Sequence, residues 1–159
     1  MKKIILLGYM GSGKSTIGKL LHESVGIRFV DTDEIIANTA ELSVSEIFAS
    51  KGELYFRKLE NEILNTLLDL NEPLVISLGG GTPCYYNNHL LLAKENVISI
   101  YLKASIATIF ERIKDKSENR PMIAGKSAEE VKEFIAKHLF DRSFYYNHAK
   151  FKIDTDNKS

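Results

Sequence analysis

Cysteine is nearly absent from this sequence of 159 residues. The single cysteine, Cys84, allows neither an intrachain disulfide nor a zinc cluster built from several cysteines. This cysteine content fits a reducing compartment, so we expect a cytoplasmic protein. A chain of this length can bury about 68–70% of the surface that its unfolded form exposes, so a single domain over residues 1–159 needs no cross-link.

An excess of charge and long apolar runs are also lacking. The chain has 21 Lys and Arg against 21 Asp and Glu, a formal net charge of zero at pH 7. Without a basic excess, the protein has no general attraction for nucleic acid or for an acidic membrane surface. The first apolar run is interrupted at Gly8, too early for a secretion signal, and no segment approaches the roughly 20 apolar residues of a membrane span. We therefore expect a soluble protein without a nucleic-acid or membrane partner.

What the sequence does contain is a regular alternation of apolar runs and helical patterns. The runs are nearly continuous rather than alternating in polarity, as is typical of parallel strands buried on both faces. We therefore predict an α/β fold with three αβα layers around a five-stranded parallel sheet, which binds ligands at the carboxyl ends of its strands. The predicted strands are 3–7, 27–30, 73–78, 97–102 and 150–153, and the predicted helices are 14–25, 33–40, 44–51, 53–70, 87–95, 105–116 and 127–148.

The segment GYMGSGKS, residues 8–15, lies between the first apolar run and a helical pattern, where a phosphate-binding loop has to be. Its glycine spacing lets successive backbone N–H groups and a helix N-terminus point at phosphate oxygens. Lys14 would reach the β and γ phosphates, and the hydroxyl of Ser15 would bind Mg²⁺. The alternative is a glycine-rich turn, which leaves a lysine unexplained at a helix start, where the dipole disfavours positive charge.

Two carboxylates, Asp31 and Asp33, follow the second predicted strand. They share a side-chain direction if the strand continues through them. One could hold Mg²⁺ through water, and the other could accept a proton from an attacking hydroxyl. The alternative is that one of them caps the next helix, which is a common use of aspartate.

Arg57 and Glu60 are three residues apart on a predicted helix and can form an ion pair. A solvated surface pair is the usual interpretation. If Arg142, far downstream, converges on the same pocket, the two arginines could bind a carboxylate by forked, charge-assisted hydrogen bonds.

Three glycines in succession, residues 79–81, follow the third predicted strand. Glycine loses more conformational freedom on folding than any other residue, so three in succession destabilise the fold, and a simple turn rarely needs all three. Close approach of a ligand to the backbone would explain them, so we expect a loop that faces the substrate.

Residues 114–126 contain Pro121 and Gly125 and lack hydrophobic periodicity. A stretch of about 12–15 residues without secondary structure is often an active-site lid, and we expect a mobile lid here. Closure would bring Arg120 over a transferring phosphoryl group, whereas the alternative is an exposed loop arginine. Arg112 either covers the flat face of a purine base or is an ordinary solvent-exposed arginine of its helix.

Together these motifs resemble the shikimate kinase family of nucleoside-monophosphate-kinase-like phosphate-loop proteins. The resemblance covers nearly the whole chain and keeps the family's order and approximate separations. It consists of GYMGSGKST at 8–16, DTD at 31–33, FRKLE at 56–60, GGG at 79–81, RP at 120–121 and the spaced Arg142, Tyr146 and Ala149.

The resemblance implies transfer of the ATP γ-phosphate to the 3-hydroxyl of shikimate, with Mg²⁺ as cofactor and shikimate and ATP as partners of a monomer. The implied catalytic residues are Asp33, which binds the attacking hydroxyl, with Lys14 and Arg120. The implied Mg²⁺ ligands are Ser15 and Asp31, the latter through water. The implied nucleotide-binding residues are Gly11, Ser12, Gly13, Lys14, Ser15, Thr16, Arg112 and Arg120. The implied substrate-binding residues are Asp33, Arg57, Glu60, Gly79, Gly80, Gly81 and Arg142.

Two other functions share parts of this pattern. A gluconate or nucleotide kinase has a similar architecture, but the arginine pair, DTD and GGG argue against it. A binding or regulatory module would keep the phosphate loop without transfer, and the presence of both Asp33 and Arg120 argues against that. Family members usually continue past the last strand into a closing helix, and we interpret the end at Ser159 as a truncation.

Overall fold

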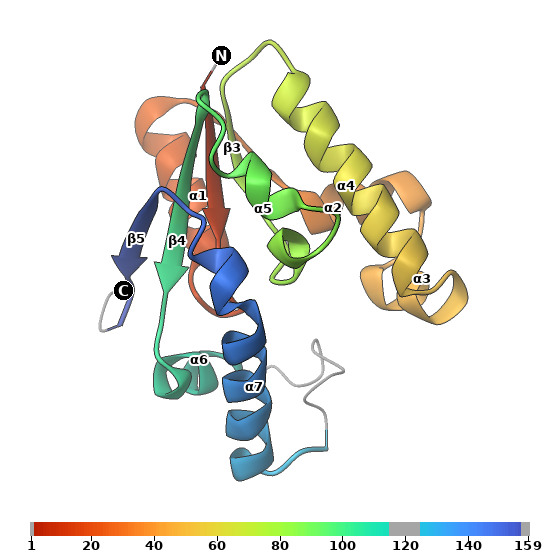
Figure 1. The fold of residues 1–159 in the computed structure, drawn as a ribbon, viewed down its shortest axis with the longest axis vertical. Coiled ribbons are helices and arrows are strands. Elements are labelled where there is room, and N and C mark those ends of the chain that lie inside the picture. Colours follow the sequence, from red (N-terminus) through yellow and green to blue (C-terminus); the bar gives the residue numbers. More distant parts are fainter. Residues whose placement is uncertain (1, 115–124, 157–159) are drawn as a thin grey trace.

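The five apolar runs form the strands of one parallel sheet in the computed structural model, which describes residues 2–114 and 125–156 (Figure 1). The strand order is β2-β3-β1-β4-β5, and every neighbouring pair is parallel. The bounds are β1 Lys3–Leu7, β2 Arg28–Asp31, β3 Leu74–Ser77, β4 Val97–Lys103 and β5 Phe151–Asp154. The strand predictions are therefore confirmed to within a few residues.

Helices connect the strands as predicted. They are α1 Lys14–Val25, α2 Thr32–Ala40, α3 Val44–Ser50, α4 Glu53–Asp69, α5 Asn88–Leu91, α6 Ile106–Ile113 and α7 Ala128–Tyr146, with a short 3₁₀ turn η1 Thr82–Cys84. The predicted helix 87–95 is too long, because the backbone N–H groups of residues 92–94 each bond the carbonyl three residues earlier and so leave the α-helical pattern. Among the helices of the described residues, none is long and apolar enough to cross a membrane.

The sheet is covered by helices on both faces. Val30 of β2 belongs to the core cluster that includes Leu64 of α4. Its neighbour Phe29 points to the opposite face, where its ring contacts Gly18 of α1 so closely that a β-carbon would not fit. Because adjacent strand residues face opposite sides, α1 and α4 belong to different layers, and the predicted three-layer αβα fold is confirmed.

This topology brings separate segments to one edge of the sheet. All five strands are parallel, so their carboxyl ends lie together. The loop 8–13 follows β1, Asp31 ends β2, and Gly79 lies two residues beyond β3. In the register of the sheet, Ser77 of β3 pairs with Leu6 on one side and with Asp31 on the other. The phosphate loop, the DTD motif and the start of the glycine run are therefore gathered at this edge.

Candidate active site

The loop 8–13 has the backbone of a phosphate-binding loop. Gly8, Gly11 and Gly13 have φ angles of 150°, 82° and 103°, which side-chain-bearing residues rarely adopt. Gly13 is the N-cap of α1 and makes no side-chain capping bond, and the first turn of that helix contains no acidic residue. The positive end of the helix dipole therefore favours an anion rather than a capping carboxylate.

A cavity of about 660 Å³ opens in front of this loop. The side chain of Lys14 lines it and donates a hydrogen bond to Gly8 O, 2.5 Å away. The lining residues are Met10, Gly11, Ser12, Gly13, Lys14, Ser15, Thr16, Ile17, Asp31, Asp33, Ser77, Leu78, Gly79, Gly80, Arg112 and Thr155. We call it the nucleotide cavity, because every loop residue assigned to nucleotide binding faces it.

Arg112 fastens the phosphate loop to the segment that follows β5. Its Nη1 donates to Gly11 O at 2.9 Å, and its Nη2 donates to Thr155 O at 2.8 Å. Both Arg112 and Thr155 line the nucleotide cavity. Arg112 is therefore not an ordinary solvent-exposed arginine of its helix. Its hydrogen bonds fix one wall of the nucleotide cavity.

The predicted Mg²⁺ ligands, Ser15 and Asp31, line the same cavity. Asp31 also caps α2, since its Oδ1 accepts hydrogen bonds from the backbone N–H groups of Asp33 at 2.8 Å and Glu34 at 3.2 Å. The capping interpretation is therefore correct for Asp31, and the strand does not continue through the pair. Hydroxyl and carboxylate oxygens beside a phosphate site are the donors that Mg²⁺ takes, so these residues fit the ion.

Asp33 lies where two cavities meet. It sits in the first turn of α2 and lines both the nucleotide cavity and a second cavity of about 810 Å³. Burial, and then the Asp31 and Glu60 carboxylates, raise the pKa of Asp33 from 3.8 to about 6, although Lys14 and Arg57 act in the opposite direction. Met10, Gly79 and Gly80 also border both cavities.

The second cavity, which we call the acceptor cavity, holds the predicted ion pair. Arg57 Nη1 lies 3.1 Å from Glu60 Oε1, and the Glu60 side chain is fully buried. The solvated-surface interpretation of this pair is therefore wrong. Burial raises the pKa of Glu60, and the Arg57 guanidinium beside it acts in the opposite direction. The Arg57 guanidinium also lies 4.1 Å from the centroid of the Tyr85 ring.

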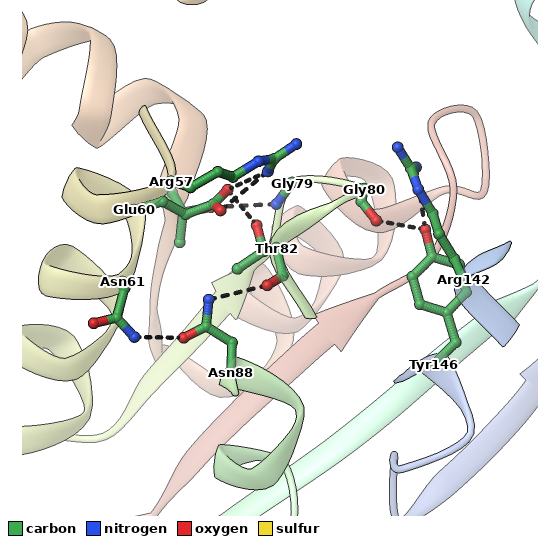
Figure 2. A network of polar contacts seen from close by, with 10 residues as sticks. Arg57, Glu60, Asn61, Gly79, Gly80, Thr82, Asn88, Arg142 and Tyr146 are labelled. Atoms are coloured by element: carbon green, nitrogen blue, oxygen red, sulfur yellow. Dashed lines mark hydrogen bonds and ion pairs between the residues drawn. The ribbon is translucent and has the colours of Figure 1, made fainter. Parts of the chain in front are cut away.

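Arg142 of α7 lines the same cavity, so the structure brings the two arginines together. Its Nη1 is 3.5 Å from the hydroxyl of Tyr146, which in turn donates to Gly80 O at 2.5 Å. Figure 2 shows Arg57 and Arg142 on opposite sides of the glycine run, each arriving from its own helix. We call Arg57 and Arg142 the arginine clamp.

The glycine run 79–81 makes room for three charged side chains. A β-carbon on the first glycine would lie 2.8 Å from Asp33 Oδ1, on the second 2.9 Å from Arg142 Nη1, and on the third 2.7 Å from Arg57 Nη2. None of the three has a positive φ. Their absent side chains, rather than their backbone freedom, let the acid and the arginine clamp converge.

Some residues of the acceptor cavity were not predicted. The hydroxyl of Tyr9 lies 2.8 Å from His138 Nδ1, and the Tyr9 ring lies 5.5 Å from the Arg142 guanidinium carbon. His138 precedes Arg142 by one helical turn, a spacing that would have indicated a shared face. Tyr85 also lines this cavity and follows the glycine run without a motif of its own. The buried Thr82, just before it in the chain, has no motif either and does not line the cavity. The predicted Arg120 and most of the predicted lid 114–126 lie outside the described residues.

Comparisons with known proteins agree on one family. The family model described as "Shikimate kinase" matches residues 10–159. A shikimate kinase of Flavobacterium johnsoniae is 56% identical over the whole chain and 92% of its own length. The crystal structure of shikimate kinase from Bacteroides thetaiotaomicron has a TM-score of 0.93 at 32% identity, over 99% of this chain and 89% of the other. The shikimate kinase of Acinetobacter baumannii in complex with shikimate has a TM-score of 0.87 at 30% identity, over 99% of this chain and 85% of the other.

Proposed function

This chain belongs to the shikimate kinase family, and on that premise we propose that Asp33 receives the proton of the attacking hydroxyl as the phosphoryl group is transferred. The reaction moves the γ-phosphate of ATP to the 3-hydroxyl of shikimate and yields shikimate 3-phosphate and ADP. The observation that carries the proposal is the position of Asp33 on the wall shared by the nucleotide and acceptor cavities. A hydroxyl bound there has the carboxylate on one side and the phosphate loop on the other.

Such a reaction depends mainly on positioning and on charge stabilisation, because phosphoryl transfer requires little covalent chemistry from the protein. Residues 11–16, which span the end of the loop and the first turn of α1, bind the phosphates, and Lys14 turns from Gly8 O to the β and γ phosphates. Ser15 and Asp31 would hold Mg²⁺, Asp31 through water. When bound, Mg²⁺ neutralises charge on the phosphate oxygens. Arg112 joins Gly11 of the phosphate loop to Thr155 and so keeps this wall of the nucleotide cavity in place beside the nucleotide.

The arginine clamp holds the carboxylate of shikimate. Two guanidinium groups that converge from α4 and α7 suit a carboxylate, which accepts paired hydrogen bonds from such planar donors. Glu60 keeps Arg57 oriented, and the backbone of residues 79–81 forms the floor of the acceptor cavity. The substrate is thereby held with its 3-hydroxyl at Asp33.

Four further expectations belong to this proposal. Arg120, from the lid 114–126, closes over the transferring phosphoryl group and stabilises its charge, and closure excludes water as a competing acceptor. Residues 1–159 act as a single kinase domain. The enzyme is a monomer and works in the cytoplasm.

A coupled assay of ADP release tests the proposed substrate. Purified protein is supplied with ATP, Mg²⁺ and, in separate reactions, shikimate, gluconate or a nucleoside monophosphate. We expect shikimate to give the highest kcat/KM of the three. Faster turnover with gluconate or a nucleoside monophosphate would exclude the assignment, and ADP release that no acceptor stimulates would favour a regulatory module.

A further inference from the structure

A buried hydroxyl lies behind the arginine clamp. Thr82, the first residue after the glycine run, is fully buried. Its Oγ1 donates a hydrogen bond of 2.6 Å to Oε2 of Glu60, while Arg57 Nη1 lies 3.1 Å from Oε1 of the same carboxylate. Glu60 is therefore held by a threonine of η1 as well as by an arginine of its own helix (Figure 2).

Thr82 is itself fixed by one amide side chain, which a second amide side chain holds in turn. Asn88 of α5 donates from Nδ2 to Thr82 O at 3.0 Å, and Asn61 of α4 donates from Nδ2 to Asn88 Oδ1 at 2.7 Å. The backbone N–H of Thr82 donates to Gly79 O at 3.1 Å. As Figure 2 shows, these contacts form a continuous path from α4 through α5 to Thr82 and back to Glu60 on α4.

The same segment also covers the face of the Arg57 guanidinium, since the Tyr85 ring centroid lies 4.1 Å from Arg57 Cζ. Glu60 therefore holds this guanidinium by one edge and Tyr85 holds it by one face. A guanidinium held in this way has little rotational freedom left to lose when it binds an anion.

We infer that Thr82 is a positioning residue of the substrate site: its hydroxyl holds the Glu60 carboxylate in the orientation that aims Arg57 at the substrate carboxylate. The inference rests on the proposed function of the arginine clamp. Glu60 has a buried carboxylate, and a buried charge needs its hydrogen-bond donors to keep one position. Without the threonine hydroxyl, Oε2 loses its charge-assisted bond of 2.6 Å and keeps its longer contact of 3.3 Å with Arg57 Nη1. The Glu60 carboxylate then holds the edge of the Arg57 guanidinium less firmly, while Tyr85 still covers its face.

The test replaces Thr82 by Val, which keeps the shape, and by Ala, which cannot clash if valine does not fit. Thermal unfolding first establishes which variant is folded. For a folded variant we expect the shikimate Kd, from calorimetric titration, and the shikimate KM to rise about tenfold, the effect of roughly one hydrogen bond to a charged group. We expect kcat and the KM for ATP to stay within about twofold of wild type, because the lost interaction acts on substrate binding.

Two further variants separate positioning from general damage. Thr82→Ser keeps the hydroxyl and should restore the wild-type shikimate Kd. Thr66→Val is the matched control. The Thr66 hydroxyl donates to Glu62 O on the exposed side of α4, the helix that carries Glu60, so this variant should bind shikimate as wild type does.

A folded variant without the hydroxyl that binds shikimate with the wild-type Kd would overturn the inference, and so would a serine variant as weak as valine. A fall in kcat with an unchanged KM would also overturn it. Failure of the proposed function looks different, because the wild-type protein itself would then show no shikimate-dependent ADP release.

Discussion

The carboxylate of Asp33 lies against Gly79, where a β-carbon would come within 2.8 Å of Asp33 Oδ1. We expect Gly79→Ala to displace Asp33 and to lower kcat by about 10²-fold, since a shift of 1 Å in a reacting group can have such an effect. Gly81→Ala is the matched comparison, because its methyl group meets Arg57 Nη2 at 2.7 Å instead. That variant should raise the shikimate KM with a smaller effect on kcat. Identical kinetic changes in the two variants would contradict this division.

Removal of either arginine of the clamp should weaken shikimate binding. Arg57→Ala and Arg142→Ala each remove a charged partner of the same carboxylate, so we expect the shikimate KM to rise about 10- to 100-fold. Arg57→Ala should also lower the free energy of unfolding, because it leaves the buried Glu60 without its charged partner. Arg28→Ala is the control, since the Arg28–Glu72 pair is exposed. An unchanged shikimate KM in both variants would exclude the clamp.

Asp33 should make the ligand-free protein less stable as the pH rises. The pKa of its carboxyl is raised from 3.8 to about 6 by burial, then by Asp31 and Glu60. The folded state therefore holds the proton more tightly than the unfolded state, and the free energy of unfolding falls as the pH rises through this window. At pH 7, Asp33→Asn should increase that free energy by on the order of 2 kcal/mol. Urea unfolding between pH 4 and 7, without nucleotide or Mg²⁺, measures it, and a less stable variant at pH 7 would contradict the expectation.

His138 should have the opposite dependence. Burial, then Arg142 and Lys137, lower its pKa from 6.5 to about 4, against the effect of Asp141. The unfolded state takes up the proton first as the pH falls from 6.5, so the fold loses stability between pH 6.5 and pH 4. The same unfolding series on His138→Gln should show a smaller loss of stability toward acid than wild type. An equal or larger loss would show that His138 is not protonated mainly in the unfolded state.

The fold could be predicted from the sequence because its signals are local. Nearly continuous apolar runs depend on neighbouring residues, and so do the pairs Ser43 with Glu46 and Ser127 with Glu130, whose three-residue spacing is typical of a capping box. Both pairs form capping boxes in the structure. The phosphate loop is also local, since its glycines adopt backbone angles that the motif requires.

The acceptor cavity depends on contacts between residues that are far apart in the sequence. The sequence does not show which of the many possible contacts form. Arg57 and Glu60 have the spacing of an ordinary surface pair, and their burial follows from the packing of α4 against η1. Thr82 lies 22 residues from Glu60 and carries no motif, so its hydrogen bond could be found only in three dimensions. For the glycine run, the sequence predicted close approach of a ligand to the backbone, which stays a prediction, and the structure adds that three charged side chains of the protein also lie close to these glycines.

Asp33 as the proton acceptor is the central claim, and the turnover of Asp33→Asn tests it most directly. The substitution keeps the shape of the side chain and removes its basic oxygen. With saturating shikimate, ATP and Mg²⁺, we predict that kcat falls by about 10²–10⁴-fold, the usual range for a lost proton acceptor, while the Kd for ATP stays near that of wild type. Wild-type kcat in this variant would contradict the account.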